Sequence, residues 1–184
     1  MARMNKLAAC LASLALAACS STETPAPPSV PDAASATAAR DPARGARAGR
    51  WLRADSERQG VPITWEFRDD IDPVRRAALP RLVVVSVLNY AQTGADQRPK
   101  APLIDAYDAI ERELLAQLSG KAELVAVLTY YYQYDWYFYT ASDDDVAAIK
   151  ALLAKAGQQD VTVNVENDPQ GEFYATLVDR VRAR

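Results

Sequence analysis

The chain has 184 residues, of which 49% are hydrophobic and 24% are charged, and this composition is typical of one soluble domain with an appendage. Histidine is absent and both cysteines, Cys10 and Cys19, lie near the N-terminus, which excludes Ser-His-Asp and Cys-His catalysis, imidazole metal sites and, in the rest of the chain, disulfides. From Trp51 onward, 15 basic and 21 acidic residues give a net charge of −6, which disfavours binding to nucleic acid.

The N-terminus has the parts of a secretory signal peptide, which we predict to cover residues 1–18. Two basic residues precede an apolar run over residues 7–16 that is too short to span a bilayer as a permanent helix. The ending Leu16-Ala-Ala-Cys19 resembles the lipobox of bacterial lipoproteins. The resemblance implies cleavage before Cys19, its lipidation, with palmitate among the acyl chains, and, because Ser20 follows, export to the outer membrane facing the periplasm. The alternative is a plain signal peptide that is cut elsewhere.

Residues 19–50 are rich in Ala, Pro, Ser and Thr and contain no aromatic residue. Such a segment cannot bury enough apolar surface to offset the entropy lost on ordering, so we predict a disordered tether. Arginines near its end either remain solvated or contact anionic lipid headgroups: Arg40, Arg44, Arg47 and Arg50. The remaining residues, 51–184, are predicted to form a single domain.

The first part of this domain contains two predicted strands and a helix. Residues 61–67 alternate between apolar and polar with a period of two, which is typical of a half-buried strand. Residues 82–88 are a β-branched run suited to a central strand buried on both faces. Apolar residues from Leu103 to Leu118 recur every three or four positions, which predicts an amphipathic helix that ends before Gly120.

Aromatic residues crowd the next segment. Residues 123–132 and 136–140 predict two strands of an antiparallel hairpin, joined by the short polar link 133–135. Because side chains alternate across a strand, Tyr137 and Tyr139 share one face of the second strand.

A helix with matching start and stop signals follows the hairpin. Ser142 is a natural N-cap, and the three aspartates after it face the positive end of the helix dipole. Gly157 can adopt the left-handed conformation that ends a helix. We therefore predict a helix that starts after Ser142, with the three aspartates in its first turn, and runs to Ala156.

The C-terminal part predicts a short strand over residues 161–165, a turn over 167–171 and a last helix over 173–181. From residue 82 onward the order is strand, helix, strand, strand, helix, strand. This order is typical of the ferredoxin-like split βαβ α+β fold, an antiparallel sheet with two helices on one face. The strand at 61–67 and the last helix are then an extra N-terminal strand and an extra C-terminal helix.

Three segments resemble a bacterial family, the domain of unknown function 695. They are residues 136–140 with the acidic helix start after them, residues 163–169 followed by Phe173-Tyr174, and Ile110-Glu111 in the helix after a proline-containing loop. The resemblance covers roughly residues 61–181 and implies a comparable α+β fold, but it implies no activity. The aromatic-Tyr-Thr segment is also similar to one in the protein regulators of ribonuclease E, which leaves a nuclease-regulator role as an alternative that requires a cytoplasmic chain.

Carboxylates suggest two candidate chemistries. The aspartates at 143–145, with Glu166 and Asp168, could gather oxygen ligands for Ca²⁺ or Mg²⁺. Successive helical residues point about 100° apart, so we interpret these aspartates as capping and solvated residues and expect no metal or cofactor. Asp135 and Glu166 could instead serve as paired carboxylates of a hydrolase, although no spacing signature supports this.

The hairpin carries more tyrosine than one small core readily hides, because every buried hydroxyl needs a partner. If helices cover only one face of the sheet, some rings lie on the open face, and we take Tyr130, Tyr132, Tyr137 and Tyr139 as the candidate binding surface. The alternative is cross-strand aromatic pairing that stabilises a partly wet sheet.

Together these observations predict a cell-envelope lipoprotein that is attached to the lipid bilayer through acylated Cys19. Its domain is expected to bind an envelope protein, a peptide or a glycan without catalysing a reaction. The alternatives are a carboxylate-dependent envelope hydrolase and a nuclease-regulator-like protein.

Overall fold

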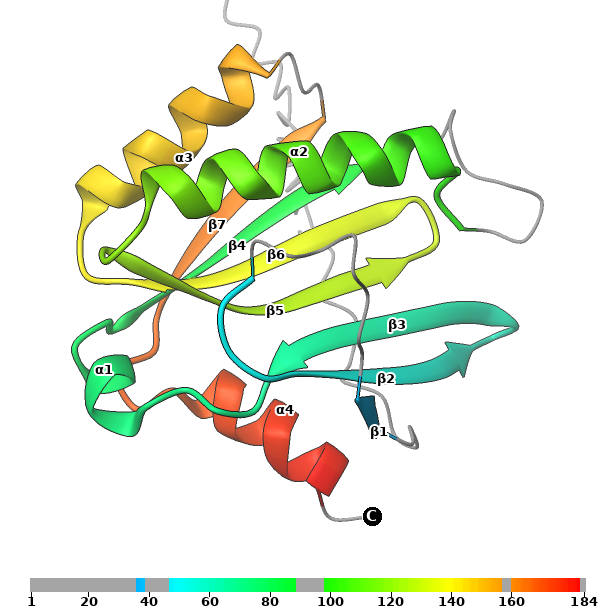
Figure 1. Ribbon diagram of the computed structural model, residues 1–184, viewed down its shortest axis with the longest axis horizontal. Coiled ribbons are helices and arrows are strands. Elements are labelled where there is room, and N and C mark those ends of the chain that lie inside the picture. Colours follow the sequence, from blue (N-terminus) through cyan, green and yellow to red (C-terminus); the bar gives the residue numbers. More distant parts are fainter. Residues whose placement is uncertain (1–35, 39–46, 89–97, 157–159, 183–184) are drawn as a thin grey trace, which may run out of the picture.

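The computed structural model describes residues 36–38, 47–88, 98–156 and 160–182, and these residues form one antiparallel sheet with helices on both of its faces (Figure 1). The elements are β1 (Ala36–Ala38), β2 (Trp51–Arg58), β3 (Val61–Arg68), α1 (Pro73–Ala77), β4 (Arg81–Leu88), α2 (Ala101–Gln117), β5 (Ala122–Tyr130), β6 (Gln133–Thr140), α3 (Asp143–Lys155), β7 (Val161–Asn167) and α4 (Glu172–Arg182). The seven strands lie in the order β1-β2-β3-β5-β6-β4-β7. The predicted α+β class is confirmed. No helix in these ranges is long and apolar enough to cross a bilayer.

The six elements predicted from residue 82 to residue 165 are all present in the predicted order, as β4, α2, β5, β6, α3 and β7. β4 lies between β6 and β7, as its β-branched run indicates, and Val83 and Val85 are completely buried. Ser142 caps α3, because its hydroxyl accepts a hydrogen bond from the backbone N–H of Asp145. The predicted stop residue, Gly157, lies outside the described residues.

The hairpin turn was predicted at the wrong place. Tyr130 pairs with Gln133, so the turn consists of Tyr131 and Tyr132, and Tyr131 has a φ of 57°. A left-handed residue of this kind allows a two-residue turn to match the twist of the flanking strands. As a result β6 begins at Gln133, and Asp135 lies inside the strand.

Three elements were not predicted, β1, β2 and α1. β2 pairs with β3 along its whole length, and the two strands are joined by Gln59 and Gly60, both with positive φ, of 55° and 80°. The sequence of β2 is mostly polar and only Ala54 is fully buried, so it has no apolar pattern from which a strand could be predicted. α1 is a single short helix that starts at Pro73, where the side chain of Asp72 accepts a hydrogen bond from Val74 N.

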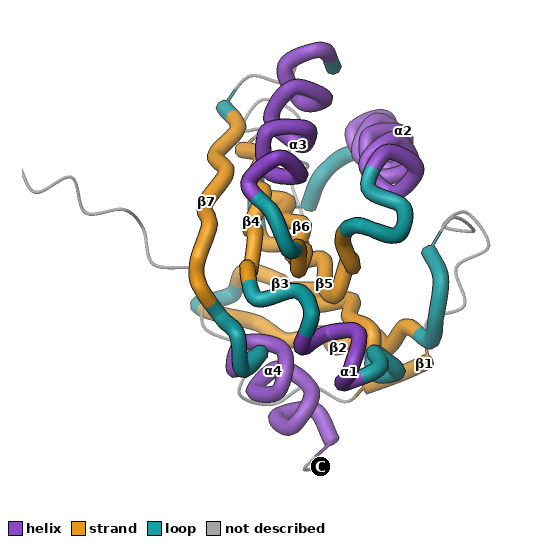
Figure 2. Tube along the Cα trace, turned by 90° about the vertical axis from the view of Figure 1, so that its left-hand side faces the viewer, coloured by secondary structure: helices purple, strands orange, loops and turns teal. Residues whose placement is uncertain are grey.

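Each face of the sheet packs against helices, which gives the domain two hydrophobic cores (Figures 1 and 2). The core beneath α2 and α3 contains Val83, Val85, Tyr107, Leu114, Trp136, Phe138 and Ile149. The core beneath α4 contains Trp65, Phe67, Leu82, Tyr137, Tyr139, Leu177 and Val178.

The expectation of an open sheet face is therefore wrong for Tyr137 and Tyr139. The two side chains do share one face, but they are 1% and 0% exposed because α4 covers them. Phe173 of α4 stacks on Tyr137 with ring centroids 4.7 Å apart and planes 8° from parallel. The sequence pattern identified which residues share a face but not that the last helix returns across it.

Asp168 holds α4 in this position. Its two carboxylate oxygens accept hydrogen bonds from Glu172 N at 2.8 Å and Phe173 N at 3.2 Å, and the hydroxyl of Tyr139 donates to it at 2.5 Å. Arg76 donates to the backbone oxygens of Asp168 and Pro169. One aspartate thus caps the helix and satisfies a tyrosine that the same helix buries.

Candidate functional site

Arg47 forms a buried ion-pair centre between the sheet and α2. Its Nη1 donates to Glu66 Oε2 of β3 at 2.6 Å, while its Nε and Nη2 donate to the two carboxylate oxygens of Glu111 of α2 at 2.5 and 2.6 Å. The Nε1 of Trp136 donates to Glu111 at 2.9 Å, and the guanidinium carbon of Arg47 lies 4.6 Å from the ring centroid of Trp51. Three charged side chains are no more than 9% exposed here.

Burial by itself would lower the pKa of Arg47, because it disfavours the charged form. The hydrogen bonds and negative charge of Glu111 outweigh that effect, so the pKa of Arg47 is raised and the guanidinium stays charged. The prediction that Arg47 is a solvated tether residue is therefore wrong. The folded part of the chain reaches back beyond residue 51, to Arg47 and to the pairing of β1 with β2.

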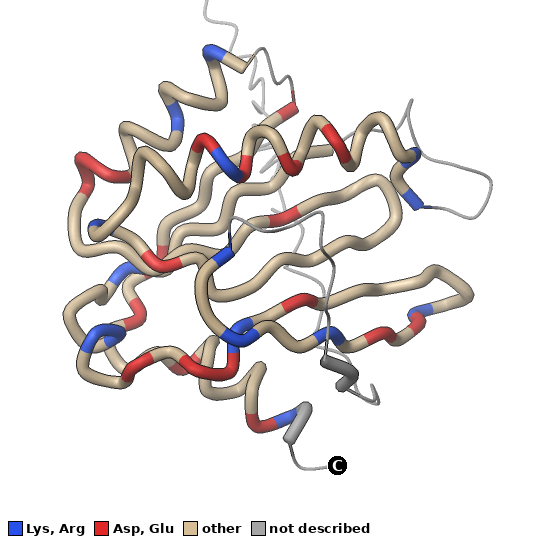
Figure 3. The backbone as a smooth tube through the Cα atoms, in the orientation of Figure 1, with Lys and Arg blue, Asp and Glu red and all other residues tan. Residues whose placement is uncertain are grey.

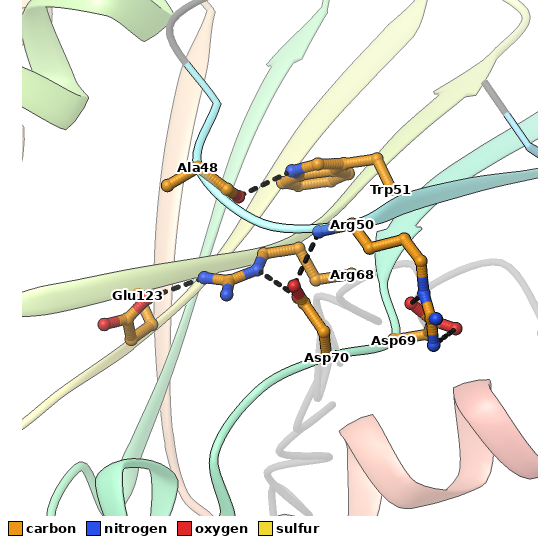
Figure 4. A network of polar contacts seen from close by, with 7 residues as sticks. All are labelled: Ala48, Arg50, Trp51, Arg68, Asp69, Asp70 and Glu123. Carbon is orange, nitrogen blue, oxygen red and sulfur yellow. Dashed lines mark hydrogen bonds and ion pairs between the residues drawn. The ribbon is translucent and has the colours of Figure 1, made fainter. Parts of the chain in front are cut away.

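A polar network holds the residues that follow Arg47 in the chain (Figure 4). Arg50 donates its backbone N–H to Asp70 and its guanidinium to Asp69, and Arg68 bridges Asp70 and Glu123 at 3.1 and 2.9 Å. The guanidinium of Arg68 lies so close to Gly49 that a Cβ there would come within 2.5 Å of it. With a φ of 89° as well, position 49 strongly favours glycine where the chain enters β2.

A pocket of about 190 Å³ lies next to this centre, on the side of the sheet that carries α2. Its lining comes from β2, β3, β5, the β5–β6 turn, the segment before α2 and the first turn of α2: Arg53, Pro62, Thr64, Glu66, Arg98, Pro99, Ile104, Thr129 and Tyr131. Glu66 belongs to both sites, so it connects the pocket to the Arg47 centre.

Asp55 does not line the pocket but is hydrogen-bonded to two residues that do, Arg53 and Thr64, and it is poorly suited to proton transfer. Asp55 accepts two hydrogen bonds from Arg53, at 2.9 and 3.0 Å, and one from Thr64 at 2.6 Å. The bond from Arg53 is the main reason why the pKa of Asp55 is lowered, and the charge of Arg98 acts in the same direction. A general acid or base is most effective with a pKa near the working pH, whereas Asp55 is moved away from it.

The pKa of Asp135 is shifted in the opposite direction, upward. Asp135 lies on the face of the sheet that α4 covers, opposite the pocket. Burial raises the pKa of its carboxyl group to about 6, although hydrogen bonds from Ser86, Gln133 and Tyr137 oppose this shift. The residue is 1% exposed, with Oδ2 at 2.7 Å from Gln133 Nε2 and at 3.2 Å from the hydroxyl of Tyr137.

The structure does not bring Asp135 and Glu166 together. Asp135 pairs with Ser86 of β4, and Ser86 pairs with Thr162 of β7, four residues before Glu166. Two strand spacings and four residues of rise separate the two Cα atoms by roughly 16 Å. The carboxyl groups of paired glycosidase residues lie about 5 to 9.5 Å apart, so the backbone spacing of these two residues does not favour a paired site.

The family of unknown function DUF695 matches residues 68–178 of the chain. The chain belongs to the DUF695 family. No curated protein and no solved structure matches it. The DUF695 region contains β4 to β7 with α1, α2 and α3 and most of α4, whereas Arg47, β2 and nearly all of β3 lie before it.

Two of the segments that carry the DUF695 resemblance have structural roles in this chain. The segment that ends in Asp168 and Pro169 caps α4, as described above. In the other segment the hydroxyl of Thr140 donates to Asp145, which is buried at the first turn of α3. Both segments therefore link the end of a strand to the start of a helix.

Three of the aspartates considered as metal ligands have protein partners. Asp143 pairs with Arg81, Asp145 accepts from Thr140, and Asp168 caps α4. Among the residues that the structure describes, no three acidic side chains converge as a metal ion would require.

The tyrosines predicted as a binding surface divide into two groups. Tyr137 and Tyr139 are buried, whereas Tyr130, at the end of β5, and Tyr132, in the hairpin turn, are half-buried. Tyr131, which the alternation argument did not select, is 39% exposed and lines the pocket. Its place in the turn is what exposes it, so a correct prediction of the turn would have identified it.

Sequence reasoning also missed Arg47, Arg53, Glu66 and Arg98. None of them belongs to a recognisable motif. Glu66 had the only usable signal, since it is a charged residue in a strand whose other residues are mostly apolar.

Proposed function

We propose that the chain is a lipid-anchored protein of the bacterial cell envelope whose folded domain binds a partner and does not catalyse a reaction. The lipobox-like ending at Cys19 supports acylation, attachment to the bilayer and a place in the outer membrane facing the periplasm. The Ala- and Pro-rich segment after it supports a tether between that anchor and the folded domain.

For the fold, we propose that β4 to β7 with α2 and α3 form a ferredoxin-like split βαβ unit. The strand order β5-β6-β4-β7, with every neighbouring pair antiparallel, supports this assignment. β1, β2 and β3 then extend the unit on the β5 side, and α4 covers its second face.

The pocket beside Tyr131 is the observation on which the binding role depends. Its volume of about 190 Å³ is smaller than the roughly 300 to 1,000 Å³ of a site that encloses a whole small molecule. It is large enough for one side chain or one sugar-sized group. We therefore assign it as the anchor point for one group of a larger partner, a protein, a peptide or a glycan of the envelope.

The lining residues suit such a group. Arg53 and Arg98 provide guanidinium donors, Thr64 and Thr129 provide hydroxyl groups, and the ring of Tyr131 provides an exposed aromatic edge. Elsewhere on the domain, acidic positions recur along α2 and basic positions are interspersed with acidic ones around α1 (Figure 3). That distribution favours a protein, peptide or glycan partner over nucleic acid.

Site-specific photo-crosslinking in intact envelopes tests the role of the pocket. A photoreactive amino acid in place of Tyr131 is expected to give one discrete adduct, whereas the same group in place of Val74, which is 80% exposed on α1, is expected to give none. Adding Arg98→Glu should reduce the Tyr131 adduct about tenfold, the effect of a loss of about 1.4 kcal/mol. Equal labelling at both positions, or no effect of Arg98→Glu in a folded protein, would rule out a specific site at this pocket.

A further inference from the structure

β7 is an edge strand with a regular and accessible outer side. In the part of the chain that the structure describes, it pairs with β4 on one side and forms the end of the sheet, as its position at the margin in Figure 2 shows. Its seven residues pair with β4 without a bulge. Natural edge strands are usually protected by lysine, proline or a bulge, and β7 has none of these.

The hydrogen bonds at both ends of β7 show which backbone groups point outward. The carbonyl oxygen of Asp160 accepts from Leu88 N at 3.2 Å, and the N–H of Asp168 donates to Pro80 O at 2.8 Å. Hydrogen-bonded and non-hydrogen-bonded positions alternate along an antiparallel pair, so the even-numbered residues between them face β4. The odd-numbered residues of β7 direct their N–H and C=O groups away from the sheet: Val161, Val163, Val165 and Asn167.

We propose that β7 pairs antiparallel with β7 of a second copy of this chain, about a two-fold axis at Asn164, so that two domains share one continuous sheet. Each pair of outward residues in an antiparallel ladder exchanges two hydrogen bonds. A register centred on Asn164 pairs all four outward residues of each strand. A register centred on Val163 or Val165 pairs only three of them.

The side chains fit this register on the face that carries α3. Val163 of one copy lies opposite Val165 of the other, which would cover a side chain that is 42% exposed in one copy. Next to it, a groove of about 380 Å³ runs between α3 and β7 and is lined by Lys150, Leu153, Ala154, Val161, Thr162 and Val163. Pairing would place the second strand alongside this groove.

The opposite face is also compatible with two identical strands. Asn164 faces itself across the axis, and Glu166, the one charged residue of β7, lies opposite Thr162. Just beyond the strand, Asp160 would approach Asp168 of the second copy. The carboxylate of Asp168 is turned toward the N-terminus of α4, where backbone N–H groups hold it. The self-complementary order of apolar, polar and charged residues is what favours a second copy over an unrelated strand.

Disulfide trapping in the full-length, membrane-attached protein tests the register. In Asn164→Cys, the two introduced cysteines would have Cα atoms about 4.5 Å apart, within the range of a disulfide. In the matched control Thr162→Cys they would be about 14 Å apart, too far for a disulfide. Both positions are exposed on the same face of β7, and both variants keep Cys19, so only the register distinguishes them.

We expect mild oxidation to give a covalent dimer at least tenfold faster with Asn164→Cys than with Thr162→Cys. Adding Val165→Lys to Asn164→Cys, a change at an exposed position, should abolish the difference while the circular dichroism spectrum stays unchanged. Equal rates for the two cysteine variants, a trapped adduct with another protein only, or no effect of Val165→Lys would overturn the proposal. The pocket lies on the β2–β3 side of the sheet, so this result does not depend on the binding role proposed above.

Discussion

Arg47 donates to both carboxylate oxygens of Glu111, at 2.5 and 2.6 Å, and each of the two side chains is 5% exposed. Arg47 precedes the first long strand, and Glu111 lies in the middle of α2, 64 residues further along the chain. This contact therefore attaches the N-terminal end of the domain to the helix layer.

Removing one partner of this pair should strongly destabilise the domain. We expect Glu111→Ala or Arg47→Ala to lower the free energy of unfolding by about 3 to 5 kcal/mol, because each leaves an uncompensated buried charge. The measurement is urea unfolding of each variant. In the control Arg50→Ala, whose side chain is 66% exposed in its pair with Asp69, the midpoint should move far less. Similar shifts of the unfolding midpoint in Arg47→Ala and Arg50→Ala would show that the buried ion pair contributes no more to stability than the exposed one.

Asp135 should make the domain less stable as the pH rises. Burial raises the pKa of its carboxyl group from 3.8 to about 6, so the folded state binds its proton more tightly than the unfolded state does. The stability gained from this proton is complete below about pH 4 and is lost as the pH rises to about 6.

The comparison with Asp135→Asn isolates this effect, because the amide does not titrate. Between pH 4 and pH 7, the free energy of unfolding of the wild type should fall by about 2 kcal/mol relative to the variant. Chemical denaturation at a series of pH values measures the difference. Parallel pH profiles for the two proteins would show that the carboxyl group is not buried as described.

Asp168→Ala should loosen α4 from the sheet. The change removes the cap of the helix and leaves the hydroxyl of Tyr139 without its partner, at a combined cost of about 2 kcal/mol. We expect a lower unfolding midpoint together with an altered near-ultraviolet circular dichroism signal, since Phe173 would no longer stack on Tyr137. Asp179→Ala, an exposed change on the same helix, should leave both signals as they are.

Cys19→Ser should release the chain from the membrane if the lipobox interpretation is correct. Each buried CH₂ of an acyl chain contributes about 0.8 kcal/mol, so the acylated protein should remain in the membrane fraction. Growth with an alkyne-tagged palmitate should label the wild type and not the variant. Label that persists in Cys19→Ser, or a wild type that stays unlabelled, would contradict the lipid anchor.

The elements best predicted from the sequence are those whose signals lie within a few residues of one another. Ser142 and the aspartates after it defined the start of α3, because capping is a contact between neighbours in the chain. The β-branched run of β4 identified a strand buried on both faces. β2 was not predicted because a strand with only one fully buried residue has no such pattern.

By itself, the sequence determined the order of strands and helices from β4 onward, the shared face of Tyr137 and Tyr139 and the absence of histidine chemistry. Only the tertiary structure decided that α4 buries those tyrosines, that Arg47 is an interior residue and that Tyr131 lines a pocket beside Arg98. Periodicity and capping depend on adjacent residues and can be seen in the sequence. Burial and ion pairing depend on residues that are far apart in the chain, such as Arg47 and Glu111, and only the folded chain brings these together.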